Sequence, residues 1–343
     1  MDRRRNPQPS LRLAAAGSAA LLLLLPGVAL AHGGAVLPAP TPLDLVFGWT
    51  FDPLVWLPVL ATALAWRWAV RTVDRQHPAN PVPRRRSWFF YAGLAVLLYA
   101  LDSGVARYDD TLFSAHMVQH LLITLVAAPL ILLGAPVTLA LRAATPAFRR
   151  RVLLPVLHSR IARALSFPPV TWVLFTAVMW GTHFSPLFDL ALENDAVHRV
   201  EHLLYIVAAL LFWWPVVGAD PMPWRIGFPG RLAYTFLQMP QNTFLALAIY
   251  SASAPLYHHY ATLTEAWLPD RLADQQAAGG IMWLGGDLLF LASLLLLTGG
   301  WLRADEKRAV LRERQTDVEV AAIRQREATL AARRSHEAGE VTD

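Results

Sequence analysis

Residues 114–137 read SAHMVQHLLITLVAAPLILLGAPV, and this segment indicates the fold class most clearly. It contains two histidines and one glutamine near its start, but no Asp, Glu, Lys or Arg. A helix needs roughly 20 predominantly apolar residues to cross the hydrocarbon core of a bilayer. The segment is long and apolar enough to do so, and it therefore predicts a transmembrane helix.

The rest of the chain has the same character. Of its 343 residues, 55% are hydrophobic and 16% are charged, whereas a soluble domain carries about a quarter charged residues. Beyond residue 50 the apolar residues form seven blocks, at 53–70, 88–101, 115–133, 167–181, 197–217, 233–250 and 279–297. A membrane barrel would instead show alternation within segments of about ten residues. We therefore expect an all-α, polytopic membrane helix bundle with about seven transmembrane helices after an N-terminal signal sequence.

The N-terminus has the three parts of a secretory signal peptide. Three arginines at residues 3–5 form a basic region, residues 11–30 form an apolar stretch, and the sequence ALA at 29–31 matches an A-x-A cleavage site. We predict a signal peptide over residues 1–31, with an uncleaved anchor as the alternative. Cleavage would leave His32 at the start of the mature chain.

Positive charge alternates from loop to loop along the chain. The loops after the first, third and fifth blocks and the start of the tail hold Arg71, Arg75, Arg84, Arg85, Arg86, Arg142, Arg149, Arg150, Arg151, Arg160, Arg163, Arg225, Arg231, Arg303, Lys307 and Arg308. Cytoplasmic loops carry the excess of Lys and Arg. We therefore expect a multi-pass protein of the bacterial plasma (inner) membrane, with a seven-span domain over 32–302 and the mature N-terminus outside. Residues 303–343 would form a charged cytoplasmic tail, either helical or disordered.

The composition also excludes several classes of chemistry. The chain has no cysteine, which rules out disulfides, thiolate metal sites and thiol catalysis. Its net charge of +5 comes with arginines placed in short loops, where they act as topology signals rather than as a nucleic-acid surface. We expect the lipid bilayer as surroundings, no nucleic-acid partner, no catalytic residues and no enzymatic activity.

The histidines gather on the side opposite the arginine-rich loops. On the expected topology, eight of the eleven fall there: His32, His116, His120, His183, His198, His202, His258 and His259. His116 and His120 form an H-x-x-x-H pair, and so do His198 and His202, which places two imidazoles on one helix face about one turn apart. Two such pairs on packed helices offer up to four nitrogen ligands for copper, zinc or iron.

Other residues near this face extend the predicted site. His183 ends the fourth block and is a fifth candidate ligand. Glu201 is expected to orient an imidazole by accepting its second N–H. Asp102 is expected to face the bundle rather than lipid. The additional candidate copper ligands are His32, His258 and His259.

Three other interpretations of these residues remain open. Each histidine taken alone is more simply a polar helix-end residue. A single haem, with one axial histidine from each of two helices, would leave the other two histidines unexplained, so a compact ion accounts for more of the pattern. A copper permease would need polar residues at mid-membrane, and those in the chain serve helix packing equally well. They are Gln238, Gln241, Asn242 and Asp287.

Three stretches resemble the caa3-type cytochrome c oxidase assembly factor family, called CtaG. They are the segment 114–137 quoted above, SPLFDLALENDAVHRVEHLLYIVAALLFWWPV (185–216) and DQQAAGGIMWLGGDLLFL (274–291), and the resemblance covers roughly residues 45–300. Members of the family often place a histidine directly after the tryptophan that ends the fourth span. Here Gly181 and Thr182 separate Trp180 from His183.

The resemblance implies a seven-span membrane protein that helps mature a haem–copper cytochrome c oxidase. It would bind copper at the histidine site and help deliver it, with oxidase subunits or a copper chaperone as partners. Carried over by motif, the residues are His116, His120, His198, Glu201, His202, Asp274 and Gln275. Asp274 and Gln275 are expected to shape the entrance of the site. A membrane haem-binding redox protein and a copper permease are the alternatives.

Overall fold

A computed structural model describes residues 37–340 of the chain, with side chains described through residue 330. These residues form helices and no strands, which confirms the all-α class. The chain divides into two compact units, Met1–Ala292 and Ser293–Asp343. The expected signal peptide and His32 lie outside the described residues.

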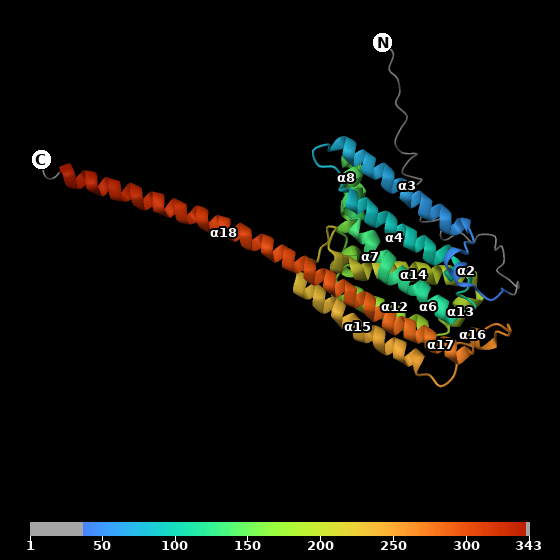
Figure 1. Cartoon of the computed structure of the whole chain (residues 1–343). Coiled ribbons are helices and arrows are strands. Elements are labelled where there is room, and N and C mark those ends of the chain that lie inside the picture. Colours follow the sequence, from blue (N-terminus) through green and yellow to red (C-terminus); the bar gives the residue numbers. More distant parts are fainter. Residues whose placement is uncertain (1–36, 341–343) are drawn as a thin grey trace, which may run out of the picture. The chain divides into compact units, whose positions relative to one another are not determined.

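The first unit is a bundle whose main helices lie side by side (Figure 1). The main segments are α3 (Pro53–Gln76), α4 (Arg84–Asp102), α6 (Phe113–Leu121), α7 (Ala128–Leu133), α12 (Pro168–His183), α14 (Asp195–Val217), α15 (Phe228–Tyr250) and α17 (Arg271–Gly280). The shorter helices are α2 (Pro42–Phe47), α5 (Gly104–Arg107), α8 (Pro136–Ala143), α9 (Pro146–Phe148), α10 (Leu154–Leu157), α11 (Arg160–Leu165), α13 (Leu187–Glu193) and α16 (His258–Thr262). The π-helical segments are η1 (Leu122–Ala127), η2 (Arg149–Leu153) and η3 (Ile281–Gly285).

The second unit continues helix α18 (Gly286–Glu340) beyond residue 292. Its described side chains from residue 303 to residue 330 carry both charge signs and are almost all exposed. Of the two states expected for the charged tail, the helix is the one that forms.

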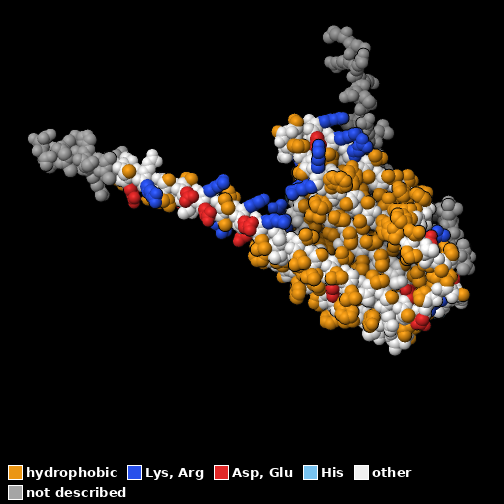
Figure 2. Space-filling model, in the orientation of Figure 1, with side chains coloured by type: hydrophobic (Ala, Val, Ile, Leu, Met, Phe, Trp, Pro, Cys, Tyr) orange, Lys and Arg blue, Asp and Glu red, His pale blue; other side chains and the backbone are white. Residues whose placement is uncertain are grey.

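Within the part of the chain that the structure describes, five helices are long and apolar enough to cross a membrane: Pro53–Gln76, Arg84–Arg107, Phe113–Ala143, Asp195–Val217 and Arg271–Leu330. In Figure 2, hydrophobic side chains cover the flank of the bundle, while Lys and Arg gather at one of its ends. The other two expected spans also form helices. However, α12 has only 16 residues, and α15 includes the buried polar residues Gln238 and Asn242. The predicted count of seven is therefore not confirmed.

The helices α6, α7 and α14 lie at the centre of the bundle. Helix α4 packs on α7 and η1, α14 packs on α7 and α12, and α17 packs on α6 and α15. Where α3 meets α4, the ring of Trp66 stacks on that of Phe90 with centroids 3.8 Å apart. Near the start of α6, Phe113 and Phe188 each pack against Tyr257, at centroid distances of 4.9 and 4.1 Å. This second aromatic cluster lies against the histidines, since the ring of Phe188 is 5.0 Å from that of His116.

The segment η1 joins α6 and α7 into one continuous helix. It begins directly after the turn that carries His120, and the hydroxyl of Thr124 within it donates to the carbonyl of His120 at 2.6 Å. Single π-turns inside α-helices occur frequently at functional sites. The local widening of this helix therefore marks the neighbourhood of His120.

Candidate metal centre

Five histidines from three helices form one cluster of adjacent rings. His116 and His120 come from α6, His183 ends α12, and His198 and His202 come from α14. The ring centroids are separated by 4.0 Å (His116 and His120), 4.3 Å (His198 and His202), 5.6 Å (His116 and His198), 6.1 Å (His120 and His202) and 6.2 Å (His120 and His183). The structure thus brings together both H-x-x-x-H pairs and His183.

Side-chain caps fix the helix ends that present these histidines. Asn194 caps α14, because its Oδ1 accepts from the backbone N–H groups of Ala196 and Val197. Asp274 of α17 accepts from the N–H of Phe113 at 2.7 Å and from that of Ser114 at 3.4 Å. A carboxylate at a helix N-terminus satisfies N–H groups that have no partner within the helix. Asp274 therefore holds the first turn of α6, one turn before the ligand candidates, rather than lining the site.

Several buried polar atoms of the cluster have no hydrogen-bond partner among the described residues. They are Nδ1 and Nε2 of His116, both ring nitrogens of His120, Nε2 of His183, Nε2 of His198, and both carboxyl oxygens of Glu201. Leaving a buried donor or acceptor unpaired costs about 1–3 kcal/mol per group. So many unpaired atoms in one place fit a site for a cation, which accepts one lone pair from each neutral imidazole and the lone pairs of the carboxylate.

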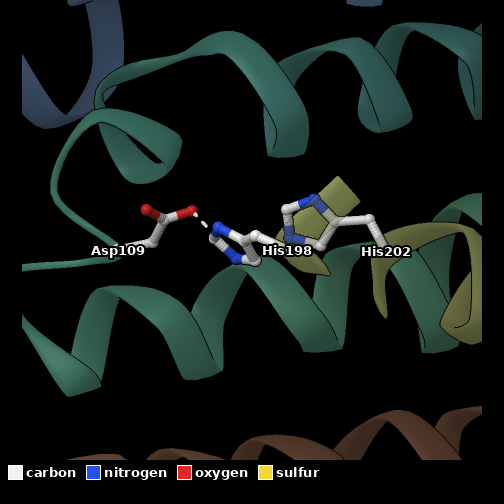
Figure 3. A group of neighbouring side chains, drawn as sticks. All are labelled: Asp109, His198 and His202. Carbon is white, nitrogen blue, oxygen red and sulfur yellow. Dashed lines mark ion pairs between the residues drawn. The ribbon is translucent and has the colours of Figure 1, made fainter. Parts of the chain in front are cut away.

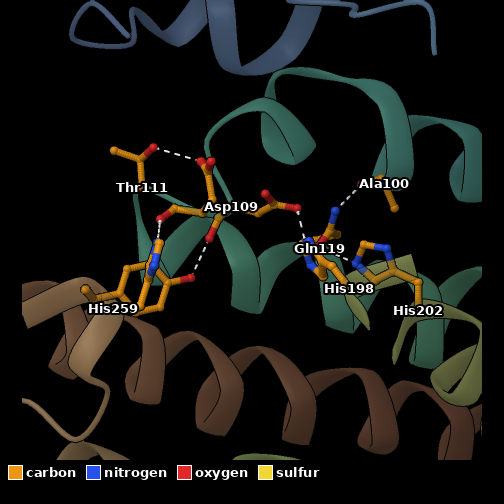
Figure 4. Close-up of polar contacts among 9 residues, drawn as sticks. Ala100, Asp109, Thr111, Gln119, His198, His202 and His259 are labelled. Carbon is orange, nitrogen blue, oxygen red and sulfur yellow. Dashed lines mark hydrogen bonds and ion pairs between the residues drawn. The ribbon is translucent and has the colours of Figure 1, made fainter. Parts of the chain in front are cut away.

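Two of the imidazoles are oriented by hydrogen bonds on their second nitrogen. Nδ1 of His183 lies 2.7 Å from the carbonyl oxygen of Met179, so this nitrogen carries the proton and Nε2 presents a lone pair. Nε2 of His202 lies 3.0 Å from Oε1 of Gln119, whose amide nitrogen donates to the carbonyl of Ala100 at 3.0 Å (Figure 4). That second bond fixes the amide orientation, so Oε1 is the acceptor and Nε2 of His202 carries the proton. Metal-bound histidines are held in this way.

Among the described residues, two groups of three side chains are close enough to hold an ion. In the first, which we call the buried triad, His116, His120 and Glu201 each offer one ligand atom within 4.8 Å of the others. In the second, the rim triad, Asp109, His198 and His202 do the same (Figure 3). The sequence placed Glu201 behind an imidazole, as a residue that orients it. The structure places its carboxyl group level with the imidazoles, as a ligand candidate.

Asp109 and Gln119 are functional candidates that the sequence reasoning missed. Asp109 lies in the short loop before α6, where no motif or spacing in the sequence marks it. Its Oδ2 is 3.9 Å from Nε2 of His198. Burial raises the pKa of the Asp109 carboxyl well above its usual value, and the nearby Asp110 adds to the effect. In the sequence, Gln119 stands out as a polar residue inside an apolar span. Burying such a side chain in a membrane helix costs free energy, so a polar partner is expected.

The remaining candidates lie outside the cluster. The carboxyl group of Asp102 is fully buried and accepts four hydrogen bonds at the start of α3. Gln275 accepts from the N–H of Leu256 at 2.7 Å and donates to the carbonyl of Ile249 at 3.2 Å, which ties the loop after α15 to α17. Asp102 and Gln275 therefore hold a turn and a loop of the bundle in place.

The two adjacent histidines near the last loop, His258 and His259, differ in burial and in contacts. His258 is exposed. His259 is half-buried, donates its backbone N–H to Asp189 at 3.0 Å, and its Nε2 lies 2.8 Å from the carbonyl oxygen of Asp110. That contact ties α16 to the loop of the rim triad (Figure 4).

Comparison with known proteins identifies a family. Residues 64–304 match the family described as cytochrome c oxidase caa3 assembly factor (Caa3_CtaG). Relatives described as uncharacterized proteins from Mycobacterium bovis and Mycobacterium tuberculosis are each 32% identical over 289 residues, and one from Mycobacterium leprae is 30% identical over 276 residues. These alignments cover 82%, 82% and 78% of this chain but only 43%, 43% and 42% of the relatives. The chain thus spans less than half the length of the curated relatives it matches. No solved structure matches the chain.

Proposed function

The chain belongs to the cytochrome c oxidase caa3 assembly factor family, and on that premise we propose that it binds copper at the histidine cluster and delivers it to a haem–copper oxidase. The observation that carries the proposal is the set of buried imidazole and carboxyl atoms without partners. Oxidase subunits or a copper chaperone are the proposed partners. Copper is cargo here, and no bond-making chemistry is required.

The donor set supports copper over the other ions that imidazole suits. The cluster contains no thiolate, and three methionines (Met117, Met179 and Met282) line a small cavity of about 20 Å³ beside His120 and His183. Thioethers and imidazoles together suit copper, and in any nitrogen and oxygen site copper binds more tightly than the other divalent first-row metals. A cavity of this size also favours a compact ion over a haem macrocycle at the buried histidines.

The proposed mechanism is ligand exchange. His198 and His202 of the rim triad line a cavity of about 760 Å³ between α3, α4, α7 and α14. A ligand from a partner that enters there would displace one protein ligand at a time. We place this cavity and the cluster at the outer face of the bacterial plasma membrane, because the arginine-rich loops lie at the other ends of the same helices and such loops remain in the cytoplasm.

Three of the four polar residues at mid-bundle, Gln238, Asn242 and Asp287, are paired with neighbouring helices, which supports delivery at one face over transport across the membrane. Gln238 accepts from Thr176 at 3.1 Å, Asn242 donates to the carbonyl of Met282 at 3.0 Å, and Thr243 donates to Asp287 at 2.7 Å. These pairs join α12, α15, η3 and α18, as helix-packing contacts do in membrane proteins. A copper permease would instead need these groups free along a pathway.

The test is the metal content of the purified, detergent-solubilised protein after incubation with Cu(I) and, separately, with Cu(II), together with an optical spectrum. The proposal expects copper in the wild type and its near-complete loss when His116, His120, His198 and His202 are all replaced by asparagine. His258→Asn, an exposed histidine outside the cluster, is the matched control and should bind as the wild type does. A wild type that takes up no copper would contradict the proposal, and a haem spectrum would favour the redox protein instead.

Gln119 offers a second, finer test. Gln119→Leu keeps the size of the side chain but removes the acceptor that holds Nε2 of His202, and loss of such a partner typically weakens metal binding about 10–100-fold. We expect that decrease in copper affinity, measured by competition with a chelator of known strength. Gln76→Leu, at an exposed position of α3, is the control. Unchanged affinity in the Gln119 variant would mean that His202 is not a ligand.

A further inference from the structure

We propose that the histidine cluster is two successive copper sites rather than one, with the rim triad receiving the ion and the buried triad retaining it. This inference rests on the proposed function, because it takes copper as the cargo. It adds a stoichiometry, a direction of movement and a role for Asp109.

The first argument is geometric. Nitrogen and oxygen ligands lie about 2.0–2.2 Å from a bound ion of this kind, so ligands of the same ion lie within about 4.4 Å of one another. Each triad comes close to this condition by itself, with its ligand atoms within 4.8 Å. Among the described residues, the groups whose ligand atoms all lie within 4.8 Å of one another here are these two triads, not one group of six. Small side-chain movements are therefore enough to close each triad around its own ion.

The orientation of the rings between the triads also separates them. The rings of His116 and His198 are stacked and nearly parallel, with an interplanar angle of 5° and centroids 5.6 Å apart. The lone pair of an imidazole nitrogen lies in the plane of its ring. Stacked parallel rings direct their lone pairs within separate planes, which favours two ions over one shared ion.

The two triads differ in their access to solvent. In the buried triad, His116 is 0%, His120 5% and Glu201 2% exposed. In the rim triad, Asp109 is 6% exposed, but His198 and His202 are only half-buried. All three rim residues line the cavity of about 760 Å³, whereas His120 lines the cavity of about 20 Å³. An incoming ion therefore meets the rim triad first.

The donors also change along this direction. The rim triad contains the carboxyl group of Asp109, a hard ligand. Beside the buried triad lie Nε2 of His183, which has no partner among the described residues, and the thioethers of three methionines. Softer ligands favour Cu(I). Since the facing rings of His120 and His202 are only 6.1 Å apart, an ion is able to pass from one triad to the other by exchanging one ligand at a time, with no change of oxidation state.

The experiment is an anaerobic titration of the full, detergent-solubilised chain with Cu(I), followed by removal with a Cu(I)-selective chelator. We expect the wild type to bind two equivalents and to release them in a fast and a slow phase. Asp109→Asn with His198→Asn should remove the fast phase and leave one slowly released equivalent. His116→Asn with Glu201→Gln should remove the slow phase and leave one rapidly released equivalent. His258→Asn should behave as the wild type.

The outcomes separate the two proposals. If the wild type binds one equivalent, and either pair of substitutions abolishes it, the cluster is a single site; the two-site inference then fails while copper binding stands. If the wild type binds no copper, the proposed function itself fails. Gel filtration reports whether each variant is folded. If a double variant does not fold, the nearly isosteric single variants Asp109→Asn and Glu201→Gln replace it. Asp109→Asn should lower the amplitude of the fast phase, and Glu201→Gln that of the slow phase. Equal effects of either variant on both phases would overturn the inference.

Discussion

Replacing Asp102 by asparagine should destabilise the bundle by about 3–6 kcal/mol, although the two side chains have nearly the same shape. Oδ1 of Asp102 accepts from the hydroxyl of Thr50 at 2.6 Å and from the N–H of Asp52 at 2.9 Å. Oδ2 accepts from the N–H of Phe51 at 3.0 Å and from the indole of Trp56 at 2.6 Å. An amide would turn an NH2 group toward two of these donors. Two hydrogen bonds to a carboxylate are then lost, each contributing about 1.5–3 kcal/mol.

The backbone next to Asp102 explains why these bonds matter for the fold. Phe51 has a φ of 59°, a left-handed conformation that costs a residue other than glycine roughly 1–2 kcal/mol. The bonds from Asp102 hold the turn that contains Phe51, and Asp52 in that turn caps α3 through the N–H of Leu54 at 2.8 Å. Without them the turn relaxes, and the start of α3 loses its attachment to α4.

The measurement is the thermal unfolding midpoint in detergent, followed by tryptophan fluorescence and by gel filtration after heating. Asp305→Asn, an exposed acidic residue of α18, is the control and should leave the midpoint unchanged. Because Asp102 lies outside the histidine cluster, Asp102→Asn protein that remains folded should still bind copper. A midpoint equal to that of the wild type would contradict the structural role assigned to Asp102. If such a stable variant also lost copper binding, Asp102 would instead belong to the metal site.

Much of the fold was predictable because lipid imposes a simple rule on sequence. All seven apolar blocks became helices, since a chain in a bilayer must satisfy its backbone hydrogen bonds within each segment. The family was predictable from the three motif stretches, and the match over residues 64–304 confirms it. The number of spans was less certain, because polar residues such as Gln238 and Asn242 lower the hydropathy of α15 even though they are satisfied by neighbouring helices.

The grouping of the histidines was predictable from spacing and depth, but their partners were not. A four-residue spacing predicts which side chains share a helix face, and the topology predicts which helix ends lie at the same membrane face. Neither the spacing nor the topology predicts which loop packs over those helix ends. Asp109 therefore entered the cluster from a loop without a recognisable pattern, while Asp102, Asp274 and Gln275, all at the expected face, were used for a turn, a helix cap and a loop.

If the chain delivers copper to an oxidase as proposed, replacing both His116 and His120 by asparagine should reduce the activity of that oxidase to the level of a strain lacking the protein. The buried triad then keeps one of its three ligands, so the ion that would be delivered is no longer retained. The measurement is oxygen consumption by isolated membranes with reduced cytochrome c, together with the ratio of copper to haem in the purified oxidase. His77→Asn, at the exposed C-terminal end of α3, should leave both quantities unchanged.

The ratio of copper to haem distinguishes delivery from a scaffolding role. If the protein supplies copper, the oxidase of the double variant should contain haem but lack copper, because only one cofactor is withheld. Raising the copper concentration of the medium should then restore part of the activity, since mass action replaces a missing donor but does not replace a missing scaffold. An oxidase that lacks haem and copper alike, and that added copper does not restore, would show that the histidine cluster is needed for assembly of the whole enzyme. An oxidase with its full copper content would show that the cluster has no part in delivery.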